Sequence, residues 1–301
     1  KRFNWIQFSC VRNFRKEVVI MEFKKYEKLE DFMRENFELI LEKEWLNCLM
    51  VGNCLEGQKI GIEGWLLAKV QQNQKTELII LYRKPWKLIM YSPTNNLPDE
   101  LYKFVAEEVY KVESELLGVN AEKEIANKFA QFYCELSKQQ YRLIKPLRIL
   151  VLENLLPKEK VKDALFREAT NKDKEILAGY IKEFAKETFG EEKTDEEANS
   201  KFEYYMKRGY YVLEKEGKIV SQAVIGRKLI KGKGISGVYT AKEERGKGYA
   251  YNLVYTLSKK CLDEGAEYCV LYTDAENPIS NHVYEKMGYL QRVECEELEF
   301  I

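Results

Sequence analysis

Gly234-Ile-Ser-Gly-Val-Tyr-Thr-Ala-Lys-Glu-Glu-Arg-Gly-Lys-Gly-Tyr-Ala250 is the stretch of the sequence that decides the fold. Its first part, up to Thr240, is rich in β-branched and aromatic residues and predicts a strand. Arg245-Gly-Lys-Gly248 predicts a turn, and the apolar pattern from Leu253 to Leu257 predicts a helix after it. A strand, a glycine-rich turn and a helix N-terminus bring free N–H groups and the positive end of the helix dipole together. The stretch therefore predicts a binding site for a pyrophosphate.

The composition is that of a folded globular protein with balanced charge. Hydrophobic residues make up 45% of the 301 residues, and charged residues make up 33%. Lysine plus arginine and aspartate plus glutamate both number 49, so net charge provides no attraction to nucleic acid or to an anionic membrane. No apolar run approaches the roughly 18 residues of a membrane span. We therefore expect neither nucleic acid nor a membrane as a partner.

The seven cysteines and the single histidine argue against a metal site. No two cysteines form a Cys-x-x-Cys pair, and His282 is the one histidine. An odd number of cysteines fits reduced, mostly buried thiols. We therefore expect a cytoplasmic protein that uses no metal.

The first twenty residues have the pattern of a translated leader. They contain basic residues throughout and no continuous apolar core, which argues against a signal peptide. Lys16-Glu-Val18 can be encoded by a ribosome-binding sequence, which would place the natural start at Met21. We therefore assign residues 1–20 to a leader or extension.

The remainder divides into two domains with similar orders of elements. Pro157 and the charged run after it predict a linker, so the domains are assigned to residues 21–157 and 158–301. We expect ααβββααβ in the first domain, with Met21 opening a helix, and βααβββαβαβ in the second. This similarity suggests a duplication in which only the second copy kept its ligand-binding turn. The corresponding Ser92–Pro98 contains no glycine, and its prolines lack an N–H.

A second group of residues follows the glycine-rich turn, running Asn277-Pro-Ile-Ser-Asn281-His-Val-Tyr284-Glu-Lys-Met-Gly-Tyr289. Val238–Ala250 and this segment resemble the acetyl-CoA motif and the later Asn…Tyr-x-x-x-Gly-Phe/Tyr motif of the GNAT superfamily of N-acetyltransferases. The resemblance covers about residues 163–301 and extends to two-domain bacterial members, in which the N-terminal half is a degenerate GNAT-like domain. It implies an α/β fold with a mixed (α+β) sheet, in which a second αβ domain precedes a C-terminal catalytic GNAT domain.

The resemblance also implies a role for each group in binding acetyl-CoA as cosubstrate. Backbone N–H groups of the turn would hold the pyrophosphate, and Arg245 would add charge or shape the turn. The edge of the preceding strand would bind pantetheine and the acetyl group and could stabilise the oxyanion. Tyr284 would be the general acid that protonates the departing thiolate. The residues implied in cofactor binding are Val238, Tyr239, Thr240, Arg245, Gly246, Lys247, Gly248, Tyr249, Ala250, Asn277 and Asn281.

Each of these residues also has an ordinary structural interpretation. Gly246 and Gly248 would form a tight turn before any helix, and Asn277 would cap the helix that it begins. Tyr284 would serve equally as a packing aromatic in a chain with 20 tyrosines. Glu294, Glu296, Glu297 and Glu299 are expected to form a solvated face, with attraction of a cationic amine as the alternative.

Activation of the acceptor is the step that the sequence leaves open. Many GNAT enzymes place a glutamate on or beside the central strand as general base, yet Gly234–Thr240 contains no carboxylate. Glu243 and Glu244 lie in the turn, so the general base is unassigned. Two functional hypotheses follow. The first is an N-acetyltransferase that acetylates a primary amine of a small-molecule or peptide acceptor by direct attack in a ternary complex. The second is a non-catalytic acyl-CoA-binding sensor or assembly module. The sequence specifies neither the acceptor nor the oligomeric state.

Overall fold

The computed structural model describes residues 19–94, 96–158 and 164–301. Its contacts divide the chain into two compact units, of which unit 2 is Arg148–Val293. Unit 1 contains the chain up to Leu147 together with Glu294–Ile301. The division expected from the sequence, at 157/158, differs from these units in two segments. It places residues 148–157 in the first domain and residues 294–301 in the second, whereas the contacts place them in unit 2 and unit 1. The proposed leader lies outside the described residues, apart from Val19 and Ile20.

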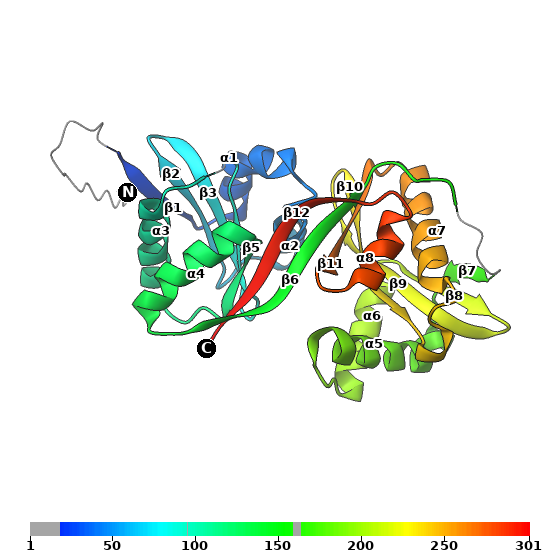
Figure 1. The fold of residues 1–301 in the computed structure, drawn as a ribbon. Helices are drawn as coiled ribbons and strands as arrows, with labels where there is room; N and C mark the ends of the chain where they lie inside the picture. The colour runs from blue at the N-terminus through cyan, green and yellow to red at the C-terminus, as the bar shows by residue number, and fades with distance from the viewer. Residues whose placement is uncertain (1–18, 95, 159–163) are drawn as a thin grey trace. The chain divides into compact units, whose positions relative to one another are not determined.

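Unit 1 is an αβ unit in which the sheet order is β1-β2-β3-β4-β5-β12 (Figure 1). Its elements are β1 (Met21–Tyr26), α1 (Leu29–Glu42), α2 (Cys48–Ile60), β2 (Leu66–Gln72), β3 (Lys75–Tyr82), β4 (Leu88–Tyr91), α3 (Asp99–Val112), β5 (Gly118–Glu122), α4 (Lys123–Ser137), the first part of β6 (Tyr141–Leu152) and the last part of β12 (Leu290–Phe300).

Two strands of unit 1 correct the expected order ααβββααβ. Met21 opens β1 and not a helix, because Met21–Tyr26 pairs antiparallel with β2. β5 lies between the two helices that the pattern predicts next to each other, and it pairs antiparallel with Cys295–Glu299 of β12. In each case the partner strand is remote in sequence, so a local pattern does not reveal the pairing.

The glutamates of β12 are not a uniformly solvated face, which corrects a second expectation. Glu296 is 7% exposed and accepts a hydrogen bond from Asn127 Nδ2 at 2.5 Å. Glu297 forms an ion pair with Lys87, with 2.5 Å between Nζ and Oε1. These carboxylates instead bind β12 to unit 1.

Unit 2 confirms the expected order βααβββαβαβ, with two short 3₁₀ turns added. Its sheet order from β11 outward is β11-β10-β9-β8-β7. The elements are the last part of β6, β7 (Leu165–Glu168), η1 (Asn171–Asp173), α5 (Lys174–Phe189), α6 (Asp195–Met206), β8 (Tyr210–Lys215), β9 (Lys218–Lys228), β10 (Gly232–Thr240), η2 (Lys242–Glu244), α7 (Tyr249–Asp263), β11 (Tyr268–Asp274), α8 (Pro278–Glu285) and the start of β12.

The two units have the same element order and the same strand pairing. In unit 1, β1–β2, β2–β3 and β3–β4 pair antiparallel and β4–β5 pair parallel. In unit 2, β7–β8, β8–β9 and β9–β10 pair antiparallel and β10–β11 pair parallel. Such identity of topology supports the proposed duplication. It also places Ser92–Pro98, which precedes α3, at the position that the glycine-rich turn occupies before α7.

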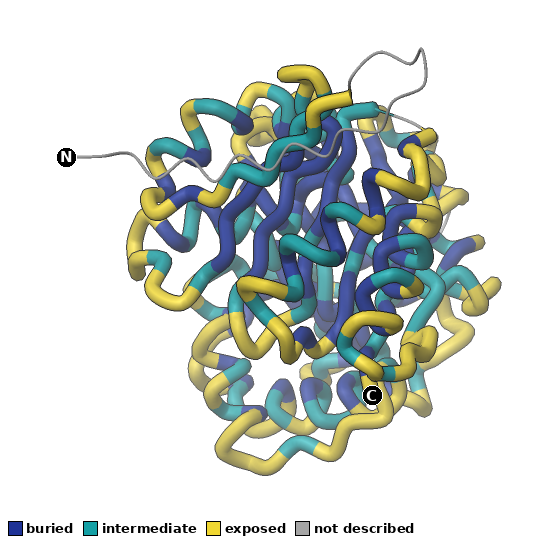
Figure 2. Tube along the Cα trace, turned by 90° about the vertical axis from the view of Figure 1, so that its left-hand side faces the viewer, coloured by how far each residue is buried: buried dark blue, intermediate teal, exposed yellow. Residues whose placement is uncertain are grey.

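Buried residues are concentrated along the strands, and exposed residues follow the loops and the outer sides of helices (Figure 2). In unit 2 one apolar cluster joins α7 to the sheet through residues such as Ile235, Leu253 and Leu271. A separate cluster joins α5 and α6 to it through residues such as Leu177 and Phe202. Helices thus cover both faces of this sheet.

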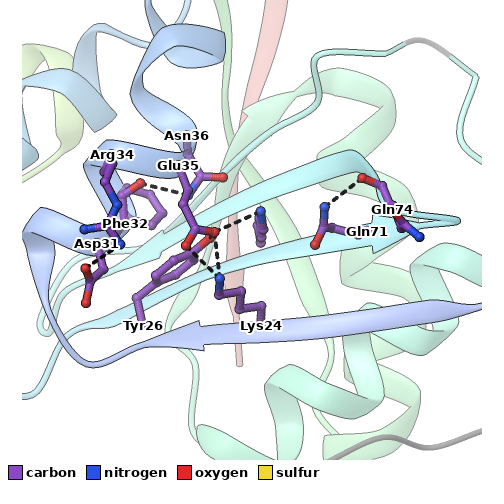
Figure 3. Close-up of polar contacts among 10 residues, drawn as sticks. Lys24, Tyr26, Asp31, Phe32, Arg34, Glu35, Asn36, Gln71 and Gln74 are labelled. Carbon is purple, nitrogen blue, oxygen red and sulfur yellow. Dashed lines mark hydrogen bonds and ion pairs between the residues drawn. The ribbon is translucent and has the colours of Figure 1, made fainter. Parts of the chain in front are cut away.

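Figure 3 shows how β1 is attached to α1 in unit 1. The Lys24 ammonium donates to both carboxylate oxygens of Glu35 at 2.7 Å, and the Tyr26 hydroxyl donates to one of them at 2.8 Å. Lys69 of β2 adds an ion pair at 3.1 Å. Partial burial alone would raise the pKa of Glu35, but these hydrogen bonds outweigh it and lower the pKa to about 2. Glu35 therefore stays ionised and connects α1 to two strands.

Candidate active site

β10 and β11 separate partway along their length. Their parallel pairing covers Gly232 with Tyr268 through Gly234 with Val270, although β10 continues to Thr240 and β11 to Asp274. On its other side, β10 has irregular register with β9 at Gly234/Ile235 and again between Ser236 and Tyr239. The edge formed by Val238, Tyr239 and Thr240 is therefore not paired with β11. We call this gap in the pairing between β10 and β11 the slot.

The glycine-rich turn follows directly from this edge. Gly246 and Gly248 have φ of +73° and +84°, values that suit glycine, and α7 starts at Tyr249 with Gly248 as its N-cap. The N–H of Asn252 donates to the Gly248 oxygen at 3.0 Å, as the first bond along α7. N–H groups ahead of it, from Tyr249 and Ala250, have no intrahelical acceptor. The turn therefore has the backbone geometry of an anion site.

Arg245 is used to shape the turn. Its Nε donates to the carbonyl oxygen of Thr240 at 3.0 Å, and its Nη2 pairs with Glu187 of α5 at 2.7 Å. The guanidinium carbon also lies 5.3 Å from the centroid of the Tyr239 ring. Of the two roles that the sequence left open, these contacts favour positioning of the turn. The neighbouring Lys247 has its ammonium 2.8 Å from Glu244.

The two asparagines of α8 differ in how they are bonded. Asn277 is the N-cap, and its side-chain oxygen accepts from the N–H of Ser280 at 3.1 Å. Asn281 is 4% exposed, and its Nδ2 donates to the carbonyl oxygen of Asp274 at 3.1 Å, which attaches α8 to the end of β11. Its Oδ1 is buried without a hydrogen-bond partner. Asn281 thus retains an acceptor for a ligand, whereas the side-chain oxygen of Asn277 is already used in capping.

Tyr284 lies one turn further along α8 and is 8% exposed. Burial raises the pKa of its hydroxyl to about 12, so the group carries its proton at neutral pH. Within the part of the chain that the structure describes, this hydroxyl makes no hydrogen bond. Its ring packs edge-on against Tyr289, with 5.9 Å between centroids. Packing and proton donation are therefore compatible roles for Tyr284.

An open depression of about 690 Å³ lies beside α8. Arg148 of β6 and Asn281 are two of its lining residues, and each has a buried polar atom without a hydrogen-bond partner, the Nε of Arg148 and the Oδ1 of Asn281. His282 of α8 also lines the depression and is exposed. The lining residues are Arg148, Ala275, Pro278, Ile279, Asn281, His282, Val283 and Glu285.

Tyr205 of α6 is a site residue that the sequence analysis did not identify. Its hydroxyl oxygen lies 3.4 Å from the position that a Cβ would take at Gly237, within the irregular part of β10. Gln222 donates to the Gly237 carbonyl oxygen at 3.3 Å and accepts from the Tyr210 hydroxyl at 2.5 Å. Helical spacing from Ala198 and Phe202 indicates that Tyr205 is buried, but no local signal places it beside β10.

The structure assigns no general base. Glu243 is exposed in η2, and Glu244 is paired with Lys247. Among the described residues, no group of three or more histidine, cysteine, aspartate or glutamate side chains is arranged to hold a metal ion. No helix within the described ranges is long and apolar enough to span a bilayer.

The sequence and the fold were compared with protein-family models, curated proteins and solved structures. Residues 178–289 match the model of the acetyltransferase (GNAT) family. The solved structure of a GNAT-family acetyltransferase from Colwellia psychrerythraea aligns with a TM-score of 0.55 and 15% identity, over 93% of this chain and 98% of its own. A GCN5-related N-acetyltransferase from Sphaerobacter thermophilus aligns with a TM-score of 0.59 and 17% identity, over 93% and 95%. No curated protein matches the sequence.

The fold of the chain, including its N-terminal half, is therefore that of GNAT acetyltransferases. Residues 178–289, which match the GNAT family model, contain the separated strands, the glycine-rich turn and Tyr284. A GNAT fold generally supports acyl transfer from an acyl-CoA.

Proposed function

We propose that the protein is an acetyl-CoA-dependent N-acetyltransferase that acetylates a primary amine of a small-molecule or peptide acceptor. The observation that carries this proposal is the separation of β10 from β11 directly before the glycine-rich start of α7. That arrangement offers hydrogen bonds to an extended pantetheine and, next to them, N–H groups for a pyrophosphate.

The donor would be bound mainly by backbone. N–H groups of Gly246, Lys247, Gly248, Tyr249 and Ala250 would hold the pyrophosphate, with Arg245 keeping the turn in place. The free edge of Val238–Thr240 would bind pantetheine and the acetyl group. Asn281 would add its unpartnered oxygen as an acceptor for an amide N–H. Asn277 would act by fixing the start of α8.

The proposed reaction is direct transfer in a ternary complex. The acceptor nitrogen bonds to the thioester carbon, the carbon–sulfur bond breaks, and the products are the N-acetylated acceptor and CoA. Backbone N–H groups near Val238 and Tyr239 would stabilise the negative charge that develops on the carbonyl oxygen. Tyr284 would protonate the departing thiolate and regain a proton from the acceptor ammonium through water. β10 contributes no carboxylate to this proton transfer.

The test is the Tyr284→Phe variant, assayed by CoA release across a broad panel of primary amines. Turnover is expected to fall about tenfold or more, because the proton donor is lost, while the Kd for acetyl-CoA changes little. Tyr289→Phe is the matched control. Its hydroxyl lies 2.9 Å from that of Ser258 in the same core, so its loss should reduce stability and leave turnover intact. Unchanged turnover in Tyr284→Phe would remove this residue from the mechanism.

The same panel tests the alternative of a non-catalytic acyl-CoA sensor or assembly module. Tight binding of acetyl-CoA without CoA release from any amine would favour that alternative. Release with one amine class above the rate of spontaneous hydrolysis would support the transferase.

A further inference from the structure

Cationic and aromatic side chains gather around the C-terminal half of α6. The ammonium of Lys201 lies 5.0 Å and 5.1 Å from the ring centroids of Tyr204 and Tyr205. The guanidinium carbon of Arg208 lies 4.1 Å from the Tyr204 ring, and its Nη1 donates to the carbonyl oxygen of Gly226 at 2.9 Å. A cationic surface therefore extends from α6 onto the end of β9.

Arg227 continues this surface across the sheet. It pairs with Gly234 of β10, and its guanidinium carbon lies 5.8 Å from the ring centroid of Tyr272 on β11. A side chain at position 234 would approach the Arg227 Cβ to 3.1 Å, so the glycine leaves room for the arginine beside β10. Arg227 thus contacts the strand on the far side of the slot.

Among the described residues, neither Lys201 nor Arg227 forms an ion pair, and the one carboxylate that acts on Lys201, Glu191, has the smallest effect on its pKa. Elsewhere on α5 and α6, lysines have acidic partners, as in the ion pair of Lys174 with Glu203. Lys201 and Arg227 are half-buried. Burial, and then repulsion from Lys193, Arg208 and Arg227, lowers the pKa of Lys201. Like charges held together at reduced solvent exposure would gain from a bound anion.

This cluster lies away from the turn proposed for the pyrophosphate. Arg227 is opposite Gly234, and the glycine-rich turn follows Thr240 at the other end of β10. Six residues of strand correspond to about 20 Å. Between the two ends, the Tyr205 hydroxyl lies beside Gly237. The cluster therefore stands at the end of the slot that faces away from the CoA phosphates.

We propose that this cluster is the acceptor subsite and that the acceptor is an amine carrying an anionic group, either a carboxylate or a phosphate. Lys201 and Arg227 bind the anion, and Tyr205 borders the path of the amine to β10. The inference rests on the proposed function, because it assigns the second substrate of the same site. The proposal predicts that amines without an anionic group, including polyamines, are poor acceptors.

The experiment measures equilibrium binding of matched amines to the full chain saturated with CoA, which cannot react. The pairs are tyrosine with tyramine for carboxylate, and O-phosphoethanolamine with ethanolamine for phosphate. The anionic member of at least one pair is expected to bind about tenfold tighter or more, and the two pairs distinguish carboxylate from phosphate. Equal binding within both pairs would overturn the proposal.

Variants locate the effect. Lys201→Gln and Arg227→Gln should each reduce this preference about tenfold, whereas Lys207→Gln and Lys228→Gln, exposed neighbours of the same charge, should retain it. A preference that survives both cluster variants would also overturn the proposal. Far-UV circular dichroism checks folding, and Arg227→Gln provides the test if Lys201→Gln misfolds. Because no turnover is measured, absence of acetyl transfer would count against the proposed function alone.

Discussion

The Nε of Arg245 donates a hydrogen bond to the carbonyl oxygen of Thr240, with 3.0 Å between the two atoms. This contact joins the last residue of β10 to the first residue of the glycine-rich turn. The hydrogen bond restrains the path of the chain from β10 into the turn. The ion pair between Arg245 and Glu187 holds the guanidinium in the position that makes this bond. We therefore expect Arg245 to affect a ligand at this turn by positioning the backbone.

Replacing Arg245 should weaken acetyl-CoA binding even where the charge is kept. Arg245→Gln and Arg245→Lys are both expected to raise the Kd for acetyl-CoA about tenfold, because lysine lacks the Nε–H that reaches Thr240. Isothermal titration calorimetry measures this directly. Recovery of wild-type affinity by lysine would show that charge, and not geometry, is the contribution. Lys247→Gln is the control, since its ammonium already pairs with Glu244.

The Gly246→Ala variant distinguishes the effect of backbone strain on stability from the effect of an added methyl group on acetyl-CoA affinity. A methyl group at Gly246 would meet no atom within 4 Å, so the cost to stability is the left-handed φ alone, about 1 kcal/mol. Gly217→Ala, in the β8–β9 hairpin, has nearly the same φ of +75° and equally open space. Both variants should lose similar stability in urea. A loss of acetyl-CoA affinity is expected for Gly246→Ala alone, and the same loss in Gly217→Ala would contradict the assignment of the turn.

Glu35→Gln should change how unit 1 responds to acid. The pKa of Glu35 is lowered from 4.5 to about 2, so the folded state favours the ionised form. Its stabilisation is fully present above pH 4.5 and disappears as pH falls through about 2. With 26% of the side chain exposed, we expect it to contribute about 1–2 kcal/mol at pH 7.

Urea unfolding at pH 7 and at pH 2.5 checks this expectation. Glu35→Gln should be less stable than the native chain at pH 7, and this difference should shrink in acid. Glu38→Gln, an exposed position on the same helix, should give no such dependence. A difference that is constant with pH would mean that Glu35 acts by packing.

Leu298→Ala should destabilise unit 1, although position 298 follows all of unit 2 in sequence. Leu298 is 1% exposed within the core of unit 1, so its truncation is expected to cost about 2–5 kcal/mol. Trp45, Trp65 and Trp86 all lie in unit 1 and report its unfolding by fluorescence. Leu290→Ala, 58% exposed on the same strand, is the control. An unshifted tryptophan transition in Leu298→Ala would argue that β12 adds little to unit 1.

The order of elements in unit 2 was predictable because its signals are local. The glycine-rich turn and the segment from Asn277 to Tyr289 each combine a strand end with the start of a helix, and such starts have sequence signatures. β1 and β5 of unit 1 were not predictable in this way, because their pairing partners lie far along the chain. Gly118 of β5 gives a partial signal. A Cβ there would come within 2.0 Å of the Leu298 carbonyl oxygen, so the position requires glycine.

The residues proposed to bind the donor could be identified from the sequence, whereas the cluster proposed to bind the acceptor could not. Motif residues such as Arg245 and Tyr284 lie within two short segments, which the sequence displays directly. The cluster around Lys201 and Arg227 joins α6, β9 and β11, and these come together only when the sheet forms. The Oδ1 of Asn281 likewise could not be identified as unpartnered from the sequence. Its orientation follows from the hydrogen bond that Nδ2 donates to the carbonyl oxygen of Asp274.

The chain leaves unit 1 within β6 and returns to it within β12. Unit 2 is therefore, in terms of connectivity, an insertion between two strands of unit 1, and no single cut releases both units whole. Cleavage at Leu147 would leave Glu294–Ile301 covalently attached to unit 2 while its partner β5 remained on the other fragment. Replacement of unit 2 by a related domain would therefore need two junctions in the chain, one within β6 and one within β12.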